Sequence, residues 1–260
     1  MLSVGRVLLC RPGGPLTKMH EVTTPFQSST TRRRPQPEEG PLVIIHEDDQ
    51  LIVLDKPPGV VVHPTYKNTS GTLLNAVLWR VRDRANAQPG ILTRLDKGTS
   101  GVVVIALTSV AHATMQKDAA AGRVSKEYLA IVRGSPSPSS GRIVLPLGRD
   151  AADRRRVVVR PDGAYCETHY DTIGRAADDM TALRCTLVTG RTHQIRVHLA
   201  AQGYPIVGDS LYGDAHATLT RQALHAWKVA LPHPVTRQRI EIEAPVPGDI
   251  RALFDQNFTL

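Results

Sequence analysis

Short runs of β-branched and other apolar residues alternate with polar turns along most of the chain. Two such runs, residues 42–45 and 51–54, flank the acidic segment 47–49 and predict an antiparallel hairpin. The continuous apolar run 102–107 predicts a strand that is buried on both faces. The same reasoning predicts further strands at residues 126–132, 157–159, 168–173, 181–188, 229–231 and 239–242. Those at 157–159, 168–173 and 181–188 are expected to continue the sheet.

Four segments show helical features. Residues 72–82 place apolar side chains on one face, and Thr72 can cap the N-terminus. A second helix is expected from residue 109 to Gly122, a typical left-handed C-terminal cap. Residues 193–201 and 249–254 supply the other two. Because strands outnumber helices and no regular βαβ alternation occurs, the pattern predicts an α+β fold with a mixed, largely antiparallel sheet and flanking helices.

The first 40 residues differ in composition from the rest of the 260-residue chain. They are rich in Ser, Thr and Pro and contain too few apolar residues for a core of their own. Residues 1–37 hold six basic residues and one acidic residue, which accounts for five of the eight net positive charges. We expect residues 1–40 to be a disordered extension or the product of a start codon placed too far upstream. An RNA-attracting tail and an organelle transit peptide are the alternatives. Residues 41–260 are expected to form the catalytic domain.

Composition also limits the class of protein. With 41% hydrophobic and 22% charged residues, the chain has enough apolar material for a packed core. No apolar run approaches the roughly 20 residues needed to cross a bilayer, and the first ten residues make a poor secretory signal. Cys10, Cys166 and Cys185 are too few and too far apart for a disulfide framework or a CxxC-type zinc site. We therefore expect a cytoplasmic protein that is not bound to a membrane.

Two polar clusters are candidates for chemistry. Residues 93–101, TRLDKGTSG, directly precede the buried strand and place an acid between two bases. Taken alone, this cluster is also compatible with a turn in which Asp96 caps backbone amides. Residues 190–198, GRTHQIRVH, form the second cluster. If this segment is helical, Thr192 and Arg196 share one face.

The second cluster has two other interpretations. Ile195 and Leu199 are expected to point toward the core, which leaves an exposed basic face as the structural alternative. Zinc binding through His193 and His198 lacks a third ligand at a sensible spacing. We therefore expect no metal site.

Together with further segments, these clusters resemble the pseudouridine synthases of the RluA type. In the family's order the segments are VIIHEDDQLIVLDKPPGVVVHP at 43–64, RLDKGTSG at 94–101, KEYLA at 126–130 and GRTHQIRVHL at 190–199, followed by GDSLYG at 208–213. Four segments in order at compatible spacing are specific, although each one alone is weak. The resemblance runs from about residue 42 to the C-terminus. It implies a pseudouridine-synthase-like catalytic domain that isomerises uridine in structured RNA, either ribosomal RNA of the large subunit or tRNA.

The resemblance also implies roles for individual residues. Asp96 matches the family's catalytic aspartate, Arg196 the arginine that pairs with it, and Tyr128 the active-site tyrosine whose ring stacks on the target uracil. Arg94 resembles a residue that fills the gap left by the target base or contacts its phosphate, and Ile195 would form a wall of the pocket. The other implied substrate-binding residues are Leu95, Thr99, Arg191 and His193.

An isomerisation of this kind requires no redox cofactor, metal or ATP. The implied partner is RNA, and the protein is expected to act as a monomer. The target base must be extruded from its stack, and basic side chains would supply salt-dependent affinity for phosphates. The candidates for that surface are Arg80, Arg82, Arg84, Lys117, Arg123 and residues 154–156.

The chain departs from the family pattern in two respects. Thr93 stands where the family commonly has histidine, and the first 40 residues do not resemble the small RNA-binding domain of many members. Two other functions remain open at this point. One is a catalytically inactive RNA-binding or ribosome-assembly factor on the same fold, and the other is a glycosidase that excises the base.

Overall fold

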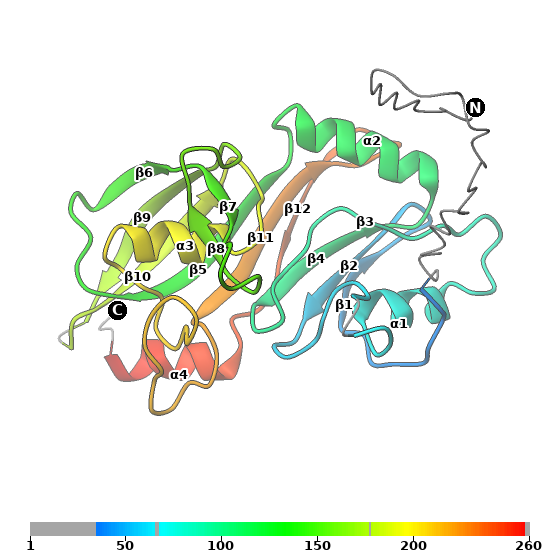
Figure 1. The fold of residues 1–260 in the computed structure, drawn as a ribbon. Coiled ribbons are helices and arrows are strands. Elements are labelled where there is room, and N and C mark those ends of the chain that lie inside the picture. Colours follow the sequence, from blue (N-terminus) through cyan, green and yellow to red (C-terminus); the bar gives the residue numbers. More distant parts are fainter. Residues whose placement is uncertain (1–34, 66–67, 177, 258–260) are drawn as a thin grey trace, which may run out of the picture. The chain divides into compact units, whose positions relative to one another are not determined.

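The computed structural model describes residues 35–65, 68–176 and 178–257 (Figure 1). The predicted extension therefore lies outside the described residues except for residues 35–40. Those residues have no regular secondary structure but contact Asn75 in the first helix. The Asn75 side chain donates a hydrogen bond to the Gln36 carbonyl at 2.6 Å, and the Glu38 N–H donates to the Asn75 carbonyl at 3.1 Å. Pro35 and the described residues that follow it belong to one compact unit.

A ten-stranded sheet organises the fold. Its strands follow the order β1-β2-β4-β11-β5-β10-β9-β6, with β3 paired to β4 and β12 paired to β11. The β4–β11 pair is parallel and the other pairs among the described strands are antiparallel. The predicted mixed, largely antiparallel sheet of an α+β fold is confirmed. The strands of this sheet are β1 (Ile44–Glu47), β2 (Leu51–Lys56), β3 (Gly90–Ile91), β4 (Ser100–Ala106), β5 (Ser125–Arg133), β6 (Ser140–Val144), β9 (Glu167–Arg175), β10 (Met180–Leu187), β11 (Leu224–Pro232) and β12 (Arg239–Glu243).

Helices cover both faces of the sheet around β2 and β4. Alternate residues of β2 point to opposite sides, so Leu51 packs in the cluster that includes α2 (Ser109–Ala120) and Ile52 in the cluster that includes α1 (Leu73–Arg80). Figure 1 shows these helices on opposite sides of the sheet. All seven residues of β4 are buried. The prediction of a strand buried on both faces is confirmed.

The four predicted helices are present, with boundaries shifted by a few residues. Thr72 caps α1 by accepting a hydrogen bond from the Asn75 N–H, and α2 ends shortly before Gly122, which has a φ of +71°. The remaining predicted helices correspond to α3 (Gln194–Ala201) and α4 (Gly248–Asn257). In the described part of the chain, no helix has both the length and the apolar character required to span a membrane.

The prediction that residues 157–159 continue the main sheet was wrong. In the described residues, β8 (Val157–Val159) pairs only with β7 (Leu147–Arg149), in a separate two-stranded sheet. The next strand along the chain, β9, already pairs with β10 on one edge and with β6 on the other, so it offers no free edge. Leu147 and Val157 of the β7–β8 hairpin pack instead with Val197 of α3.

Close packing of β4, β11 and β5 brings distant parts of the sequence together. Ala226 of β11 pairs with Gly101 of β4 on one side and with Tyr128 of β5 on the other. Gly101 has a φ of +108°, and a Cβ atom there would lie 2.1 Å from the Ala226 carbonyl oxygen. Only glycine permits this approach. The loop that precedes β4 therefore ends two strands away from Tyr128.

Candidate active site

The β3–β4 loop, residues 92–99, is held by side chains from two other parts of the chain. The Lys56 side chain is fully buried, and its ammonium group donates to three backbone carbonyls at 2.8, 2.9 and 3.2 Å, the last being that of Lys97. Burial lowers the pKa of Lys56 to about 8. The Arg221 guanidinium donates to the carbonyl of Gly98 at 3.1 Å. These bonds fix the loop backbone immediately after Asp96.

Asp96 lies at the end of a chain of charge-assisted hydrogen bonds. Arg196 Nη1 donates to Asp96 Oδ2 at 2.9 Å, while Nε and Nη2 of the same guanidinium donate to Asp209 at 2.6 and 2.8 Å. The side chains of Arg196 and Asp209 are 8% and 1% exposed. Burial alone would lower the pKa of Arg196, but its hydrogen bonds and the charges of both carboxylates raise it. A permanent positive charge, oriented by Asp209, therefore faces Asp96.

His193 approaches the other oxygen of the Asp96 carboxylate. It immediately precedes α3 and has a left-handed φ of +55°, which is uncommon outside glycine. Its Nε2 lies 3.8 Å from Asp96 Oδ1, and its Nδ1 lies 2.7 Å from the Tyr212 hydroxyl. That hydroxyl accepts a hydrogen bond from the Val157 N–H at 2.8 Å, which leaves its own proton for Nδ1. The arrangement favours the tautomer in which Nε2 carries the proton and faces Asp96.

Burial also affects the charge of this histidine. Desolvation lowers the pKa of His193, against the opposing influence of Asp96. The neutral ring is therefore favoured. The condition for a face shared by Thr192 and Arg196 is not met, because α3 begins at Gln194 and Thr192 precedes the bend at His193.

Apolar side chains form the other boundary of the centre. Tyr128 and Ile195 are 7% and 4% exposed in the same buried cluster, and Leu95 packs against that cluster. Burial raises the pKa of the Tyr128 hydroxyl, and the charge of Asp96 raises it further. Tyr128 is therefore a neutral phenol in contact with a largely apolar environment. The predicted orientation of Ile195 toward the core is confirmed.

The remaining predicted substrate-binding residues lie outside this hydrogen-bonded group. Arg94 is an exposed residue of the β3–β4 loop. Thr99 is buried, and its hydroxyl accepts a hydrogen bond from the Gln222 side chain at 3.0 Å, which supports the loop. Arg191 is exposed and lines a cleft with the β7–β8 hairpin. The structure thus brings together Asp96, Arg196 and His193. Arg94 lies on the same loop as Asp96, two residues before it.

His198 belongs to the core. Its two ring nitrogens lie 3.0 Å from the Thr168 hydroxyl and 3.1 Å from the Leu145 carbonyl. No group of three or more His, Cys, Asp or Glu residues within the described ranges is placed to hold a metal ion. Cys166 and Cys185 are buried and free, and Cys10 lies outside the described residues.

The chain is similar to known RNA pseudouridylate synthases. Residues 50–201 match the family described as RNA pseudouridylate synthase. The chain is 43% identical over 238 residues to the ribosomal large subunit pseudouridine synthase D of Xanthomonas campestris pv. campestris, covering 86% of this chain and 71% of that protein. The chain belongs to the RNA pseudouridylate synthase family. As a pseudouridylate synthase it is an isomerase that acts on RNA.

Other relatives of this pseudouridylate synthase give the same result. A protein with the same name from Nitrosomonas europaea is 42% identical over 228 residues, which cover 84% of this chain and 66% of the relative. The chain thus spans about two thirds of the length of these two curated relatives. The solved structure of human RNA pseudouridylate synthase domain containing 1 is 26% identical with a TM-score of 0.64, covering 80% of this chain and 86% of the human chain.

Three parts of the site in this synthase were missed by the sequence analysis. Asp209 and Tyr212 lie within the GDSLYG segment, beyond the matched residues 50–201, and Lys56 lies within DKPPG. Both segments contributed to the resemblance. Their spacing did not show that Asp209 would bind Arg196, or that Lys56 would hold the loop of Asp96. The available signal for Lys56 was its position two residues after the apolar run 51–54, at the end of a predicted strand.

Proposed function

We propose that this protein converts uridine to pseudouridine in ribosomal RNA of the large subunit, with Asp96 as the catalytic residue. The observation that carries the proposal is the contact between Asp96 and Arg196, in which a buried arginine fixed by Asp209 orients one carboxylate oxygen and leaves the other beside His193. The names of the two curated relatives support large-subunit ribosomal RNA as the substrate.

The reaction requires one ionised carboxylate. The bond between N1 of uracil and C1′ of ribose breaks, the base turns, C5 bonds to C1′, C5 loses its proton, and N1 takes up a proton in its place. Asp96 can attack as a nucleophile or remove a proton from the sugar, and both routes need its charged form. A glycosidase usually uses a second carboxyl group to protonate the leaving group. Uracil leaves as a delocalised anion and stays bound, so Asp96 suffices.

The neighbouring residues receive separate roles in this proposal. Tyr128, Ile195 and Leu95 hold the extruded uracil against an apolar surface, and the neutral Tyr128 hydroxyl can exchange a proton at the new carbon bond. Arg94, which is exposed on the same loop as Asp96, takes the space of the extruded base or contacts its phosphate. Extrusion of a stacked base costs a few kcal/mol, which the RNA contacts must offset.

Replacing Asp96 with asparagine tests the assignment. We expect Asp96→Asn to form no pseudouridine in total cellular RNA, measured by carbodiimide-dependent primer extension. Asp171→Asn is the matched control, since Asp171 is a partly exposed carboxylate paired with Arg184 on the sheet. Pseudouridine formation by Asp96→Asn at the wild-type level would refute the role of Asp96.

The substrate and the rival function need a second experiment. Pseudouridine is mapped in a strain that lacks the protein, and the proposal expects a position in large-subunit ribosomal RNA to lose its modification. Loss at a tRNA position would correct the substrate. Unchanged modification combined with retained RNA binding would support the inactive assembly factor instead.

Residues 41–260 form the catalytic domain, and the enzyme acts as a monomer in the cytoplasm without a metal or cofactor. We expect EDTA to leave the rate unchanged and the purified protein to sediment at the mass of one chain. Activity that falls with EDTA and returns with zinc would contradict the metal-free mechanism.

A further inference from the structure

A basic cleft lies beside the candidate active site. It is formed by the β7–β8 hairpin together with residues 191–193, and its volume is about 240 Å³. No Asp or Glu is among the described residues that line it. The charged side chains of its lining are Arg149, Arg154, Arg155, Arg156 and Arg191.

Most of these arginines have no acidic partner. Arg155 forms an ion pair with Asp153 at 2.7 Å, whereas within the described ranges the other four form none. Arginines that the sequence analysis also considered for RNA binding differ in this respect, since Arg80 pairs with Glu47 and Arg123 with Asp118. The cleft therefore concentrates positive charge that the protein itself does not neutralise, and such charge attracts anions.

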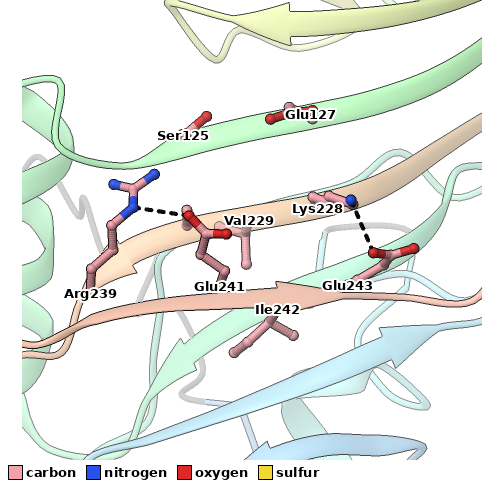
Figure 2. A pocket seen from close by; sticks show the side chains of 9 residues that line it. Ser125, Glu127, Lys228, Val229, Arg239, Glu241, Ile242 and Glu243 are labelled. Atoms are coloured by element: carbon pink, nitrogen blue, oxygen red, sulfur yellow. Dashed lines mark hydrogen bonds and ion pairs between the residues drawn. The ribbon is translucent and has the colours of Figure 1, made fainter.

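A second hollow in the molecule shows the opposite arrangement. It lies over β5, β11 and β12, and Figure 2 shows that its cations face carboxylates. Lys228 pairs with Glu243 at 3.1 Å and Arg239 pairs with Glu241 at 3.1 Å, with Glu127 as a further acid on the same lining. This hollow carries no excess of positive charge. The two hollows therefore differ in charge: only the basic cleft has an excess of positive charge.

The basic cleft is connected directly to the catalytic carboxylate. His193 lines the cleft, and its Nε2 lies 3.8 Å from Asp96. The guanidinium of Arg156 lies 5.1 Å from the centre of the Tyr212 ring, and Tyr212 in turn bonds to the backbone of Val157 and to His193. These contacts tie the hairpin to the active centre. An RNA strand with one nucleotide at Asp96 can therefore place an adjoining nucleotide in the cleft.

We infer that the basic cleft binds a backbone phosphate of the RNA next to the uridine that enters the active site. This inference rests on the proposed function and names a subsite for it. Guanidinium groups form two parallel hydrogen bonds with a phosphate, so unpaired arginines suit this ligand. Holding the adjoining phosphate offsets the cost of extruding the uridine and fixes its ribose over Asp96.

The first test removes two of the unpaired charges. Arg154→Gln combined with Arg191→Gln alters two exposed side chains that have no ion pair in the described residues, and Arg239→Gln serves as the control. For substrate RNA we expect the double variant to bind more weakly at low salt. The slope of log K against log salt should decrease in magnitude by roughly 0.7 to 0.9, the change expected when the contact to one phosphate is lost.

Several results of this test would overturn the inference. An affinity and salt slope of the double variant equal to those of the wild type would do so. An equal loss in Arg239→Gln would also do so, because it would show a general effect of charge. Thermal melting of each variant checks that the fold is retained.

The second test alters the RNA and leaves the protein intact. A neutral methylphosphonate replaces one linkage at a time on either side of the target uridine. We expect one adjoining position to weaken binding to the wild type, and the same replacement to have no further effect on the double variant. Equal weakening of both proteins at every position would refute the inference. Wild-type protein that binds RNA through the cleft but forms no pseudouridine would refute the proposed function alone.

Discussion

Replacing Asp209 with asparagine removes a buried negative charge and changes the shape of the side chain very little. In the native protein the two carboxylate oxygens of Asp209 accept hydrogen bonds from Nε and Nη2 of Arg196 at 2.6 and 2.8 Å. The asparagine carbonyl can keep one of these bonds. The asparagine NH2 group then faces the second N–H of Arg196, and two donors cannot form a hydrogen bond with each other. Arg196 thereby loses the constraint that aims Nη1 at Asp96.

The expected loss of rate and stability in Asp209→Asn follows from the hydrogen bond that is lost. A hydrogen bond to a charged group contributes about 1.5 to 3 kcal/mol, and about 1.4 kcal/mol corresponds to a factor of ten in rate. We therefore expect Asp209→Asn to lower the single-turnover rate by roughly 10-fold to 150-fold. The free energy of unfolding should fall by a similar 1.5 to 3 kcal/mol, because Asp209 is buried. RNA affinity should stay near the wild-type value, since Asp209 is 1% exposed and cannot reach the RNA surface.

The assay follows tritium released from RNA that carries label at C5 of uridine, with enzyme in excess. Asp118→Asn is a matched control, because Asp118 is also buried and binds two arginines, Arg123 and Arg237, in another part of the fold. Urea unfolding measures the stability of both variants. We expect both to be destabilised and only Asp209→Asn to lose rate.

Two outcomes would refute this reasoning. Asp209→Asn with a wild-type single-turnover rate would show that Arg196 needs no second carboxylate to position Asp96. An equal loss of rate in Asp118→Asn would show that reduced stability, and not the orientation of Arg196, slows the reaction.

Three further predictions concern pH and backbone geometry. Burial lowers the pKa of Lys56 to about 8, while its unfolded value is near 10.5, so the contribution of Lys56 to the unfolding free energy rises between these two pH values. Loss of the proton from Lys56 also leaves one loop carbonyl without its hydrogen-bond donor, so the reaction rate of the wild type should fall above pH 8. Lys56→Met should lack this decline. The Asp118 pKa is lowered to about 2, chiefly by the hydrogen bond from Arg237. This interaction should therefore contribute up to about 2 kcal/mol to the unfolding free energy above pH 4, and the contribution should be lost as the pH falls to 2. Urea titrations of Asp118→Asn should not show this loss. Gly101→Ala should reduce the unfolding free energy by more than about 3 kcal/mol, because the added methyl group would collide with β11. In Gly122→Ala the added methyl group meets no neighbour within 4 Å, so this variant should lose only about 1 to 2 kcal/mol through backbone strain. Equal losses in the two variants would contradict the steric explanation.

Local patterns were sufficient for most of the secondary structure. The strand at residues 102–107 and the helix capped by Thr72 were predicted because burial periodicity and capping depend on neighbours a few residues apart. The assignment of residues 157–159 to the main sheet failed because strand pairing is a long-range property. Whether Thr192 belongs to the helix of Arg196 was left open by the sequence, because no local pattern predicts the left-handed conformation of His193.

The sequence by itself determined which side chains are available for chemistry, including Asp96, Tyr128 and Arg196, and in which order they follow. Only the tertiary structure decided which charges meet. Asp96 and Arg196 are 100 positions apart, and their contact depends on strand pairings that close long loops. The same holds for charge neutralisation, since Arg80 has an acidic partner and Arg154 has none in the described residues. Periodicity reports which face of an element is buried, whereas electrostatic partnership depends on distances in space that the order of residues does not contain.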